Sequence, residues 1–185
     1  SDFAGLVKTR GKELEKRNKA LSISDFKKLR SYLLQNYNKE FYVMVLLALE
    51  TGARRGELLA LTKNDIIEYG IKIERSISPT SPDTRLKTKR SKRTVTINKD
   101  VYEIINTLIP KENGYLFDSD GFQQSAKLAR LLKKLDIPRT TFHGLRDTHA
   151  SFLFSNDNIR LDYISQRLGH SNLQKTMNYY LELMP

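Results

Sequence analysis

Two side chains that can bind a phosphate lie one helical turn apart in the segment Thr141–Ser151. His143 and Arg146 are separated by three residues in the sequence TFHGLRDTHAS. On an α-helix this spacing places both side chains on the same face. Arg presents a planar fork of donors to two phosphate oxygens, and His adds a donor that can also carry a proton. The segment therefore predicts an anion site of the phosphate type.

A second candidate anion site lies in the sequence TGARRGE. Gly52 is expected to end one helix, and the next helix begins at once. The start of a helix carries unpaired N–H groups and a partial positive charge, which favour an anion. Arg54 would lie at this start, and Glu57 is placed to brace an Arg side chain. A surface Arg–Glu pair that caps a turn is the alternative interpretation.

The charge of the whole chain points to a polyanionic partner. Its 185 residues carry 32 Lys and Arg against 21 Asp and Glu, which gives a net charge of +11 and a pI of about 9.8. This excess is typical of nucleic-acid binders, with simple solubility as the alternative. The chain has no Cys and three His, which argues against a structural zinc site. No apolar run is long enough to cross a bilayer, so we expect no membrane span.

The basic residues are densest in Arg85–Arg93, where six of nine residues are Lys or Arg. Strand-like alternation precedes the run in Ile66–Ile77 and follows it in Thr94–Ile97, so we expect it to project from a small antiparallel sheet. An ammonium group there could reach a DNA groove and donate a proton. Lys87 is the candidate, with Lys89 as its rival. A solvated loop that blunts a sheet edge is the alternative.

Helical periodicity dominates the rest of the chain. Leu21–Tyr37 predicts a helix with Ser24 as its N-cap, and the apolar run Phe41–Leu49 predicts a buried helix. Ser78–Asp83 is rich in Pro and Ser and predicts a loop. Gly169 is expected to end a helix directly before His170. Further helices are expected at Asp100–Leu108, Gly121–Leu135, His143–Asn156, Ile159–Leu168 and, capped by Ser171 or Asn172, near the C-terminus.

These elements predict one mainly α domain with a small antiparallel β-sheet. We expect the domain to span residues 21–185. Residues 1–20 are charged and weakly patterned, so we expect a linker there.

Four motifs occur in a recognisable order: TGARRGE around Arg54, HGLRDTHAS, LGHSN around His170, and a Tyr about ten residues later. This order and spacing resembles the tyrosine recombinase (integrase) family, in particular the integrases of phages and mobile elements. The resemblance extends from about Leu21 to Pro185. It implies the catalytic-domain fold of DNA breaking-rejoining enzymes, with N-terminal DNA-binding domains that this chain lacks.

The resemblance also implies roles for single residues. Arg54 and Arg146 would bind the scissile phosphate. Lys87 would protonate the leaving 5′ oxygen, and Glu57 would support the site. The other basic residues of the run would contact DNA: Arg85, Lys89, Arg90, Lys92 and Arg93.

The remaining roles fall to histidines and to one tyrosine. His143 would be the base and His170 a donor to a phosphate oxygen. Tyr179 and Tyr180 follow His170 by nine and ten residues. In the family the attacking Tyr is commonly followed by a small or polar residue, a His and an apolar residue. Tyr180 fits this frame, with Glu182 in place of His, so the resemblance favours Tyr180 and leaves Tyr179 as the rival.

The implied function is site-specific DNA recombination through a 3′-phosphotyrosine intermediate, without metal or cofactor. The implied partner is double-stranded DNA at attachment sites, bound by a homotetramer, whereas the fragment alone is expected to be a monomer. The implied location is the cytoplasm of a bacterial host. Two alternatives remain open at this point: a non-catalytic DNA-binding module on the same fold, and DNA relaxation of the type IB topoisomerase kind.

Overall fold

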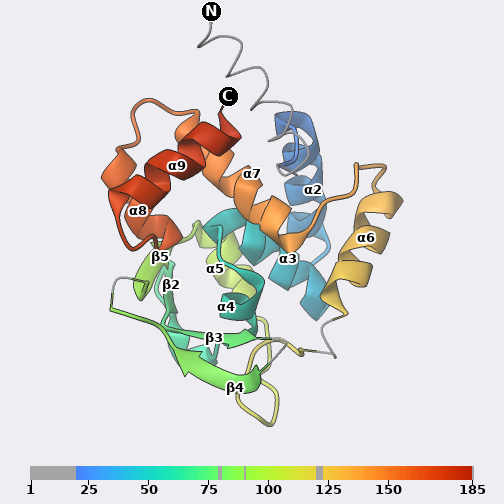
Figure 1. Cartoon of the computed structure of the whole chain (residues 1–185). Coiled ribbons are helices and arrows are strands. Elements are labelled where there is room, and N and C mark those ends of the chain that lie inside the picture. The colour runs from blue at the N-terminus through green and yellow to red at the C-terminus, as the bar shows by residue number, and fades with distance from the viewer. Residues whose placement is uncertain (1–19, 79–80, 90, 120–122, 185) are drawn as a thin grey trace, which may run out of the picture.

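The computed structural model describes residues 20–78, 81–89, 91–119 and 123–184. The expected linker, apart from residue 20, and Arg90 lie outside these ranges. The described chain is mainly helical with small antiparallel sheets, which confirms the predicted fold class (Figure 1). Within the described ranges, none of the helices is long and apolar enough to span a bilayer.

Helix α3 (Glu40–Thr51) is the buried helix that the apolar run predicted. Every residue from Tyr42 to Leu49 is buried, and the helix ends at Gly52 with φ +68°. Figure 1 shows α3 behind α7 (Phe142–Phe154), and the two helices pack against each other. The C-terminal end of α3 thereby lies against the helix that carries the His143/Arg146 motif.

Helix α2 (Ile23–Gln35) also packs on α3, but it begins earlier than predicted. Ser22, rather than Ser24, is the N-cap, and its hydroxyl accepts a hydrogen bond from the Asp25 N–H. The preceding Leu21 is held by its N–H, which donates to Thr148 Oγ1 at 2.9 Å. This tertiary contact fixes where the helix starts. The other helices that pack against α3 are α4 (Arg55–Leu59), α5 (Lys99–Ile105) and α6 (Gln124–Lys134).

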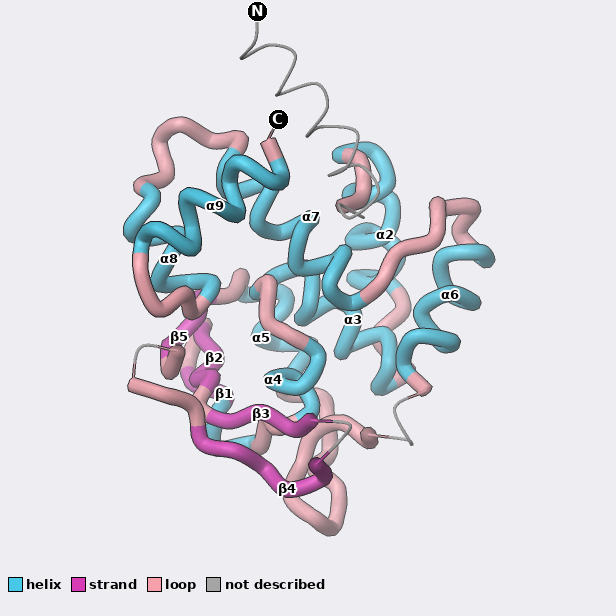
Figure 2. The backbone as a smooth tube through the Cα atoms, in the orientation of Figure 1, coloured by secondary structure: helices cyan, strands magenta, loops and turns pink. Residues whose placement is uncertain are grey.

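Two small sheets replace the single predicted sheet (Figure 2). The first has the order β1 (Ile66–Ile67), β2 (Gly70–Ile73) and β5 (Arg93–Thr96), and both pairings are antiparallel. Tyr69, with φ +56°, lies in the turn between β1 and β2, and Gly70 is the first residue of β2.

The second sheet pairs β3 (Arg75–Ser78) with β4 (Ser81–Leu86). The predicted loop at Ser78–Asp83 is therefore wrong outside residues 79–80, which the structure does not describe. Both strands of a two-stranded sheet are edge strands, and an edge strand tolerates Pro because its outer side needs no N–H donor. The basic run leaves β4 and enters β5, so it connects the two sheets.

Helices α8 (Leu161–Leu168) and α9 (Leu173–Leu183) pack on each other and on α7. Gly169 ends α8 with φ +74°, as predicted, and Asn172 caps α9 by accepting a hydrogen bond from the Lys175 N–H. Figure 1 shows α8 and α9 on one side of the molecule and α2 and α6 on the other. A small separate hydrophobic cluster supports this unit: Ala150, Phe154, Ile164, Leu168 and Leu183.

Candidate active site

Arg54 occupies the position that the sequence predicted, at the N-cap of α4. Its backbone N–H donates to Glu57 Oε1 at 2.9 Å, so the start of the helix is closed by a carboxylate. Its guanidinium is 46% exposed and lies 3.9 Å from Glu57 Oε2. The charge of Arg54 therefore faces solvent above a buried acidic group.

Arg146 is the second guanidinium, and it is almost completely buried. Nη1 donates to the carbonyl of Gly52 at 2.8 Å, and Nη2 donates to the carbonyl of Leu168 at 2.9 Å. These carbonyls lie at the C-terminal ends of α3 and α8, where backbone acceptors lack partners within their helices. Burial and the charge of Arg54 lower the pKa of Arg146 to about 10, so it remains a cation at neutral pH.

His170 lies against Arg146 as the motif order implied. Its Nε2 is 3.5 Å from Arg146 Nη2, and its Nδ1 is 2.8 Å from Thr176 Oγ1. Burial, followed by the charges of Arg146 and Arg54, lowers the pKa of His170 to about 4. The imidazole is therefore neutral at pH 7. If the Thr176 hydroxyl donates to Nδ1, the proton stays on Nε2, which faces the same region as Arg146.

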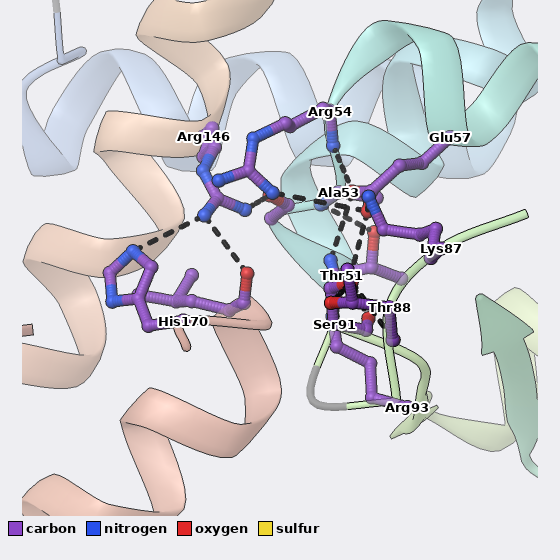
Figure 3. A network of polar contacts seen from close by, with 12 residues as sticks. Thr51, Ala53, Arg54, Glu57, Lys87, Thr88, Ser91, Arg93, Arg146 and His170 are labelled. Atoms are coloured by element: carbon purple, nitrogen blue, oxygen red, sulfur yellow. Dashed lines mark hydrogen bonds and ion pairs between the residues drawn. The ribbon is translucent and has the colours of Figure 1, made fainter. Parts of the chain in front are cut away.

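Arg54, Arg146 and His170 line one open cleft of about 270 Å³. Figure 3 shows the guanidiniums of Arg54 and Arg146 close together, with His170 on the far side of Arg146. His143 lines the cleft as well; it is 69% exposed, and its Nε2 lies 3.4 Å from Asp147 Oδ1. The full lining is Arg54, His143, Arg146, His170, Lys175, Asn178, Tyr179 and Glu182. Segments more than a hundred residues apart thus form one positively charged cleft, which has about the size of a phosphate group and the atoms bonded to it.

The two tyrosines differ in their relation to this cleft. Tyr179 lines it, and its phenol donates a hydrogen bond to Asp147 Oδ1. Tyr180 is absent from the lining, and its ring packs on Phe154 with centroids 5.4 Å apart. Consecutive side chains on a helix point about 100° apart, so only one of the pair can face the cleft. The geometry favours Tyr179 over Tyr180, the residue that the family frame preferred.

Tyr179 is protonated at neutral pH in this arrangement. Burial, together with the charge of Asp147 and its hydrogen bond, raises the pKa of the phenol well above its ordinary value. Arg146 and Arg54 act in the opposite direction but do not outweigh these effects. A reaction that uses this oxygen as a nucleophile therefore needs an acceptor for its proton.

Glu57 lies beneath Arg54 and is 1% exposed. It accepts hydrogen bonds from the Lys87 ammonium at 2.8 Å and from Arg93 Nη1 and Nη2 at 2.8 and 2.9 Å. Burial alone would raise the pKa of Glu57, but Arg93 and Lys87 outweigh it and hold the pKa far below its usual range. Glu57 therefore lies closer to the charged groups of Lys87 and Arg93 than to the guanidinium of Arg54.

The basic run divides into inward and outward residues. Arg85, Lys89 and Lys92 are exposed, as a DNA-contacting role requires. Arg93 is buried, unlike these three residues, so in this structure its side chain is not exposed for the predicted contact with DNA. The alternation of β5 explains this orientation, because Arg93 and Val95 share the buried face of the strand.

A model of the phage integrase family matches residues 19–184. The chain belongs to the phage integrase family. Among its relatives, the integrase of Haemophilus phage HP1 (strain HP1c1) is 32% identical over 144 residues, which cover 77% of this chain and 37% of the relative. A XerC-like tyrosine recombinase of Caldanaerobacter subterraneus is 27% identical over 209 residues, which cover 94% of this chain and 52% of the relative. This chain thus spans about half of such a relative or less.

Solved structures show the same fold. The Tn1549 transposon integrase in complex with transposon right end DNA has a TM-score of 0.69 at 22% identity, over 87% of this chain and 61% of that chain. The catalytic domain of bacteriophage HP1 integrase has a TM-score of 0.58 at 24% identity, over 88% of this chain and 87% of that chain. The fold of this phage integrase family member is therefore that of tyrosine recombinase catalytic domains.

Arg167 of this family member is a buried residue that the sequence did not single out. Its Nε donates to His149 Nε2 at 3.0 Å, and its Nη2 donates to the carbonyls of Glu50 and Thr96. His149 in turn contacts the carbonyl of Leu49 through Nδ1, and burial lowers its pKa to about 3. Arg167 thus ties the end of α3 to β5 beneath the cleft. The feature of the sequence that could have pointed to Arg167 was its position three residues before His170.

Asp147 is the other residue that was missed. It is 3% exposed and follows Arg146 directly, so its presence inside the HGLRDTHAS motif was the signal for it. In the part of the chain that the structure describes, no group of three or more His, Cys, Asp or Glu side chains is arranged to hold a metal ion.

Proposed function

We propose that this chain cleaves and rejoins DNA strands through a covalent phosphotyrosine, in the site-specific recombination of a phage or another mobile element. The observation that carries the proposal is the cleft in which Arg54, Arg146, His170 and the phenol of Tyr179 meet. The names of the relatives, integrase and tyrosine recombinase, support the same activity. One structural neighbour was solved in complex with transposon DNA, which supports DNA as the substrate.

The two guanidiniums would hold the scissile phosphate. A phosphodiester repels a nucleophile by its negative charge, and charge on its non-bridging oxygens grows in the five-coordinate transition state. Arg146 is fixed by two backbone carbonyls, so its remaining donors are oriented before the substrate arrives. His170, neutral at pH 7, would add a neutral N–H donor to one of the same oxygens.

The chemical step forms one bond to phosphorus and breaks another. The phenol oxygen of Tyr179 attacks, the bond from phosphorus to the 5′ oxygen breaks, and a 3′-phosphotyrosine results. The phenol proton passes to Asp147, which already accepts the phenol hydrogen bond and lies 3.4 Å from His143. His143 thus acts beside the carboxylate rather than on the phenol directly. Lys87 gives its proton to the leaving 5′ oxygen, and rejoining is the reverse of these transfers.

The larger assembly follows from the same family. We propose double-stranded DNA at attachment sites as the partner and four protomers on DNA, with the fragment alone a monomer. Residues 21–185 would serve as the catalytic domain beside N-terminal DNA-binding domains, in the cytoplasm of a bacterial host. The exposed residues Arg85, Lys89 and Lys92 are placed to contact the DNA backbone.

The test is capture of the covalent adduct. A pool of nicked duplexes with randomised sequence beside the nick is incubated with the chain, and protein–DNA adducts that survive denaturation are isolated. Sequencing of the DNA then gives the site, and mass spectrometry of the peptide gives the attacking residue. We expect an adduct at Tyr179, lost in Tyr179→Phe and retained in Tyr180→Phe. An adduct at Tyr180 would overturn the choice of nucleophile.

The alternatives have distinct outcomes in the same experiment. Wild-type protein that binds the duplexes but forms no adduct would be a non-catalytic DNA-binding module. Adducts without sequence preference, together with relaxation of supercoiled plasmid, would identify a topoisomerase-like activity. Adducts enriched in one sequence support recombination at defined sites.

A further inference from the structure

Among the described residues, Lys87 and Arg93 make the closest ion pairs with Glu57, and they differ in how firmly they are held. The Arg93 side chain is 1% exposed and makes two hydrogen bonds to the carboxylate, at 2.8 and 2.9 Å. The Lys87 side chain is 14% exposed and makes one contact, at 2.8 Å. Figure 3 shows Lys87 and Arg93 reaching Glu57 from the same loop region. Arg93 is therefore the more permanent partner.

The guanidinium of Arg93 is held by contacts on several sides. Nε donates to the carbonyl of Arg167 at 2.9 Å, and Nη1 also donates to the carbonyl of Ser91 at 3.0 Å. Gly169 lies against the guanidinium so closely that a Cβ there would be 2.5 Å from Nη1. Arg93 thus keeps its position whether or not Lys87 is in contact with Glu57.

We propose that Arg93 is a positioning residue that frees Lys87 to act as the acid of the cleavage step. This inference rests on the proposed function. When Lys87 gives its proton to the leaving 5′ oxygen it becomes a neutral amine, and Glu57 loses one of its two closest cations. A buried carboxylate without a partner is strongly destabilised. Because Arg93 stays in place, Glu57 remains paired through the transfer, and that destabilisation does not arise.

Without Arg93, the same arrangement should hinder the transfer of the Lys87 proton. Among the described residues, Glu57 would then keep two cationic partners, Lys87 at 2.8 Å and Arg54 at 3.9 Å. The carboxylate would hold the ammonium in place and resist loss of its proton. Within the described part of the chain, Arg93 makes no hydrogen bond or ion pair with Arg54, Arg146 or Tyr179. The effect should therefore be confined to the departure of the 5′ oxygen.

The experiment compares two versions of one nicked duplex, built on the sequence recovered from the adducts. The first has the natural oxygen at the scissile 5′ position, and the second has sulfur, which leaves without taking a proton. We expect Arg93→Gln to slow adduct formation on the oxygen duplex by roughly a hundredfold, the range of general-acid effects, and to match wild type on the sulfur duplex. Lys87→Ala is the reference and should show the same pattern.

A second variant separates positioning from simple loss of structure. In the double variant Arg93→Gln/Glu57→Gln, the neutral amide no longer holds the Lys87 ammonium, so the rate on the oxygen duplex should rise above that of Arg93→Gln alone. A purely structural role predicts a further loss instead. Should Arg93→Gln fail to fold by circular dichroism, Arg93→Lys, which keeps one cation at Glu57, should show a smaller selective loss.

Each remaining outcome counts against a specific claim. Equal slowing of Arg93→Gln on both duplexes, or no slowing on either, would overturn the role of Arg93. Wild-type protein that forms no adduct on either duplex would overturn the proposed function itself, before Arg93 enters the question.

Discussion

The phenol of Tyr179 donates a hydrogen bond to Asp147, the residue next in sequence to the buried Arg146. One helical segment therefore supplies both a cation for the phosphate and an acceptor for the phenol proton. Asp147 also lies 3.4 Å from the exposed imidazole of His143. The proton that leaves Tyr179 thus has a path toward solvent through two neighbouring groups on α7.

Replacement of this acceptor should slow the reaction. We expect Asp147→Asn to reduce single-turnover adduct formation by roughly a hundredfold, since an amide cannot take the proton. The rate of the variant should increase with pH, because the carboxylate that raises the pKa of Tyr179 has been removed and the phenolate forms more readily. DNA affinity measured by fluorescence anisotropy should stay unchanged. An Asp147→Asn protein as fast as wild type at neutral pH would exclude Asp147 as the acceptor.

Arg54 offers a cleaner test of phosphate binding than Arg146, because its guanidinium does not hold the scaffold together. We expect Arg54→Ala to lower the rate of adduct formation by about a hundredfold to a thousandfold, as for the loss of one transition-state donor. Arg130→Ala, an exposed cation on α6, is the matched control and should retain the wild-type rate. Similar rates for both variants would contradict a role of Arg54 at the phosphate.

Stability should fall as the solution is acidified below pH 6.5. The pKa of His149 is about 3 and that of His170 about 4, whereas each is about 6.5 in an unfolded chain. The unfolded chain binds more protons in this window, so the free energy of unfolding decreases as pH falls from about 6.5 to about 4.

His149→Gln serves as the matched variant for this prediction. An amide at this position can donate to the Leu49 carbonyl and accept from Arg167, but it does not titrate. Thermal unfolding followed by circular dichroism should therefore show a smaller loss of Tm on acidification for His149→Gln than for wild type. Parallel curves would show that His149 does not cause the acid sensitivity.

Gly169 and Gly114 give a matched pair for the packing around Arg93. Both have positive φ, +74° and +88°, so alanine is strained at either position. A Cβ at Gly114 meets nothing within 4 Å, whereas at Gly169 it meets the buried Arg93 guanidinium. We expect Gly114→Ala to cost about 1 kcal/mol of unfolding free energy and Gly169→Ala clearly more. Equal costs in urea unfolding would show that Arg93 can move aside.

The salt dependence of DNA binding should separate the outward residues of the basic run from Arg93. Replacing Arg85, Lys89 or Lys92 with Ala should each reduce the slope of log affinity against log salt by about one, the value for one lost phosphate contact. Arg93→Gln should leave the slope unchanged. A reduced slope in Arg93→Gln would place its side chain at the DNA surface, in conflict with its burial.

Much of the cleft could be predicted because its parts are local motifs. Gly52 and Gly169 end their helices in the left-handed conformation, as their positions indicated, and this places Arg54 and His170 just beyond two helix ends. The three-residue spacing of His143 and Arg146 placed both on the cleft. These predictions depend on backbone geometry within a few residues, which the sequence determines directly.

The features that the sequence placed wrongly or left open share one cause, namely contacts between distant segments. Arg93 belongs to a basic run and reads as a surface residue, yet a buried carboxylate 36 positions earlier pulls it inward. The choice between Tyr179 and Tyr180 depends on which face of α9 lies against Asp147, 32 residues from Tyr179. The start of α2 at Ser22 depends on Thr148. None of these partners is visible in the local pattern.

Arg146 would bind the proposed substrate, and it also links the C-terminal ends of α3 and α8 by hydrogen bonds to two backbone carbonyls. A cell that carries a substitution at this position would lose protein abundance along with catalysis, because the two carbonyls would be left without a donor. In genetic screens for inactive integrases, substitutions of Arg146 would therefore give poorly expressed protein, whereas substitutions of Arg54 would give protein that is well expressed but inactive. Loss of Arg146 would combine two defects, so a change that restored DNA binding alone would not restore activity.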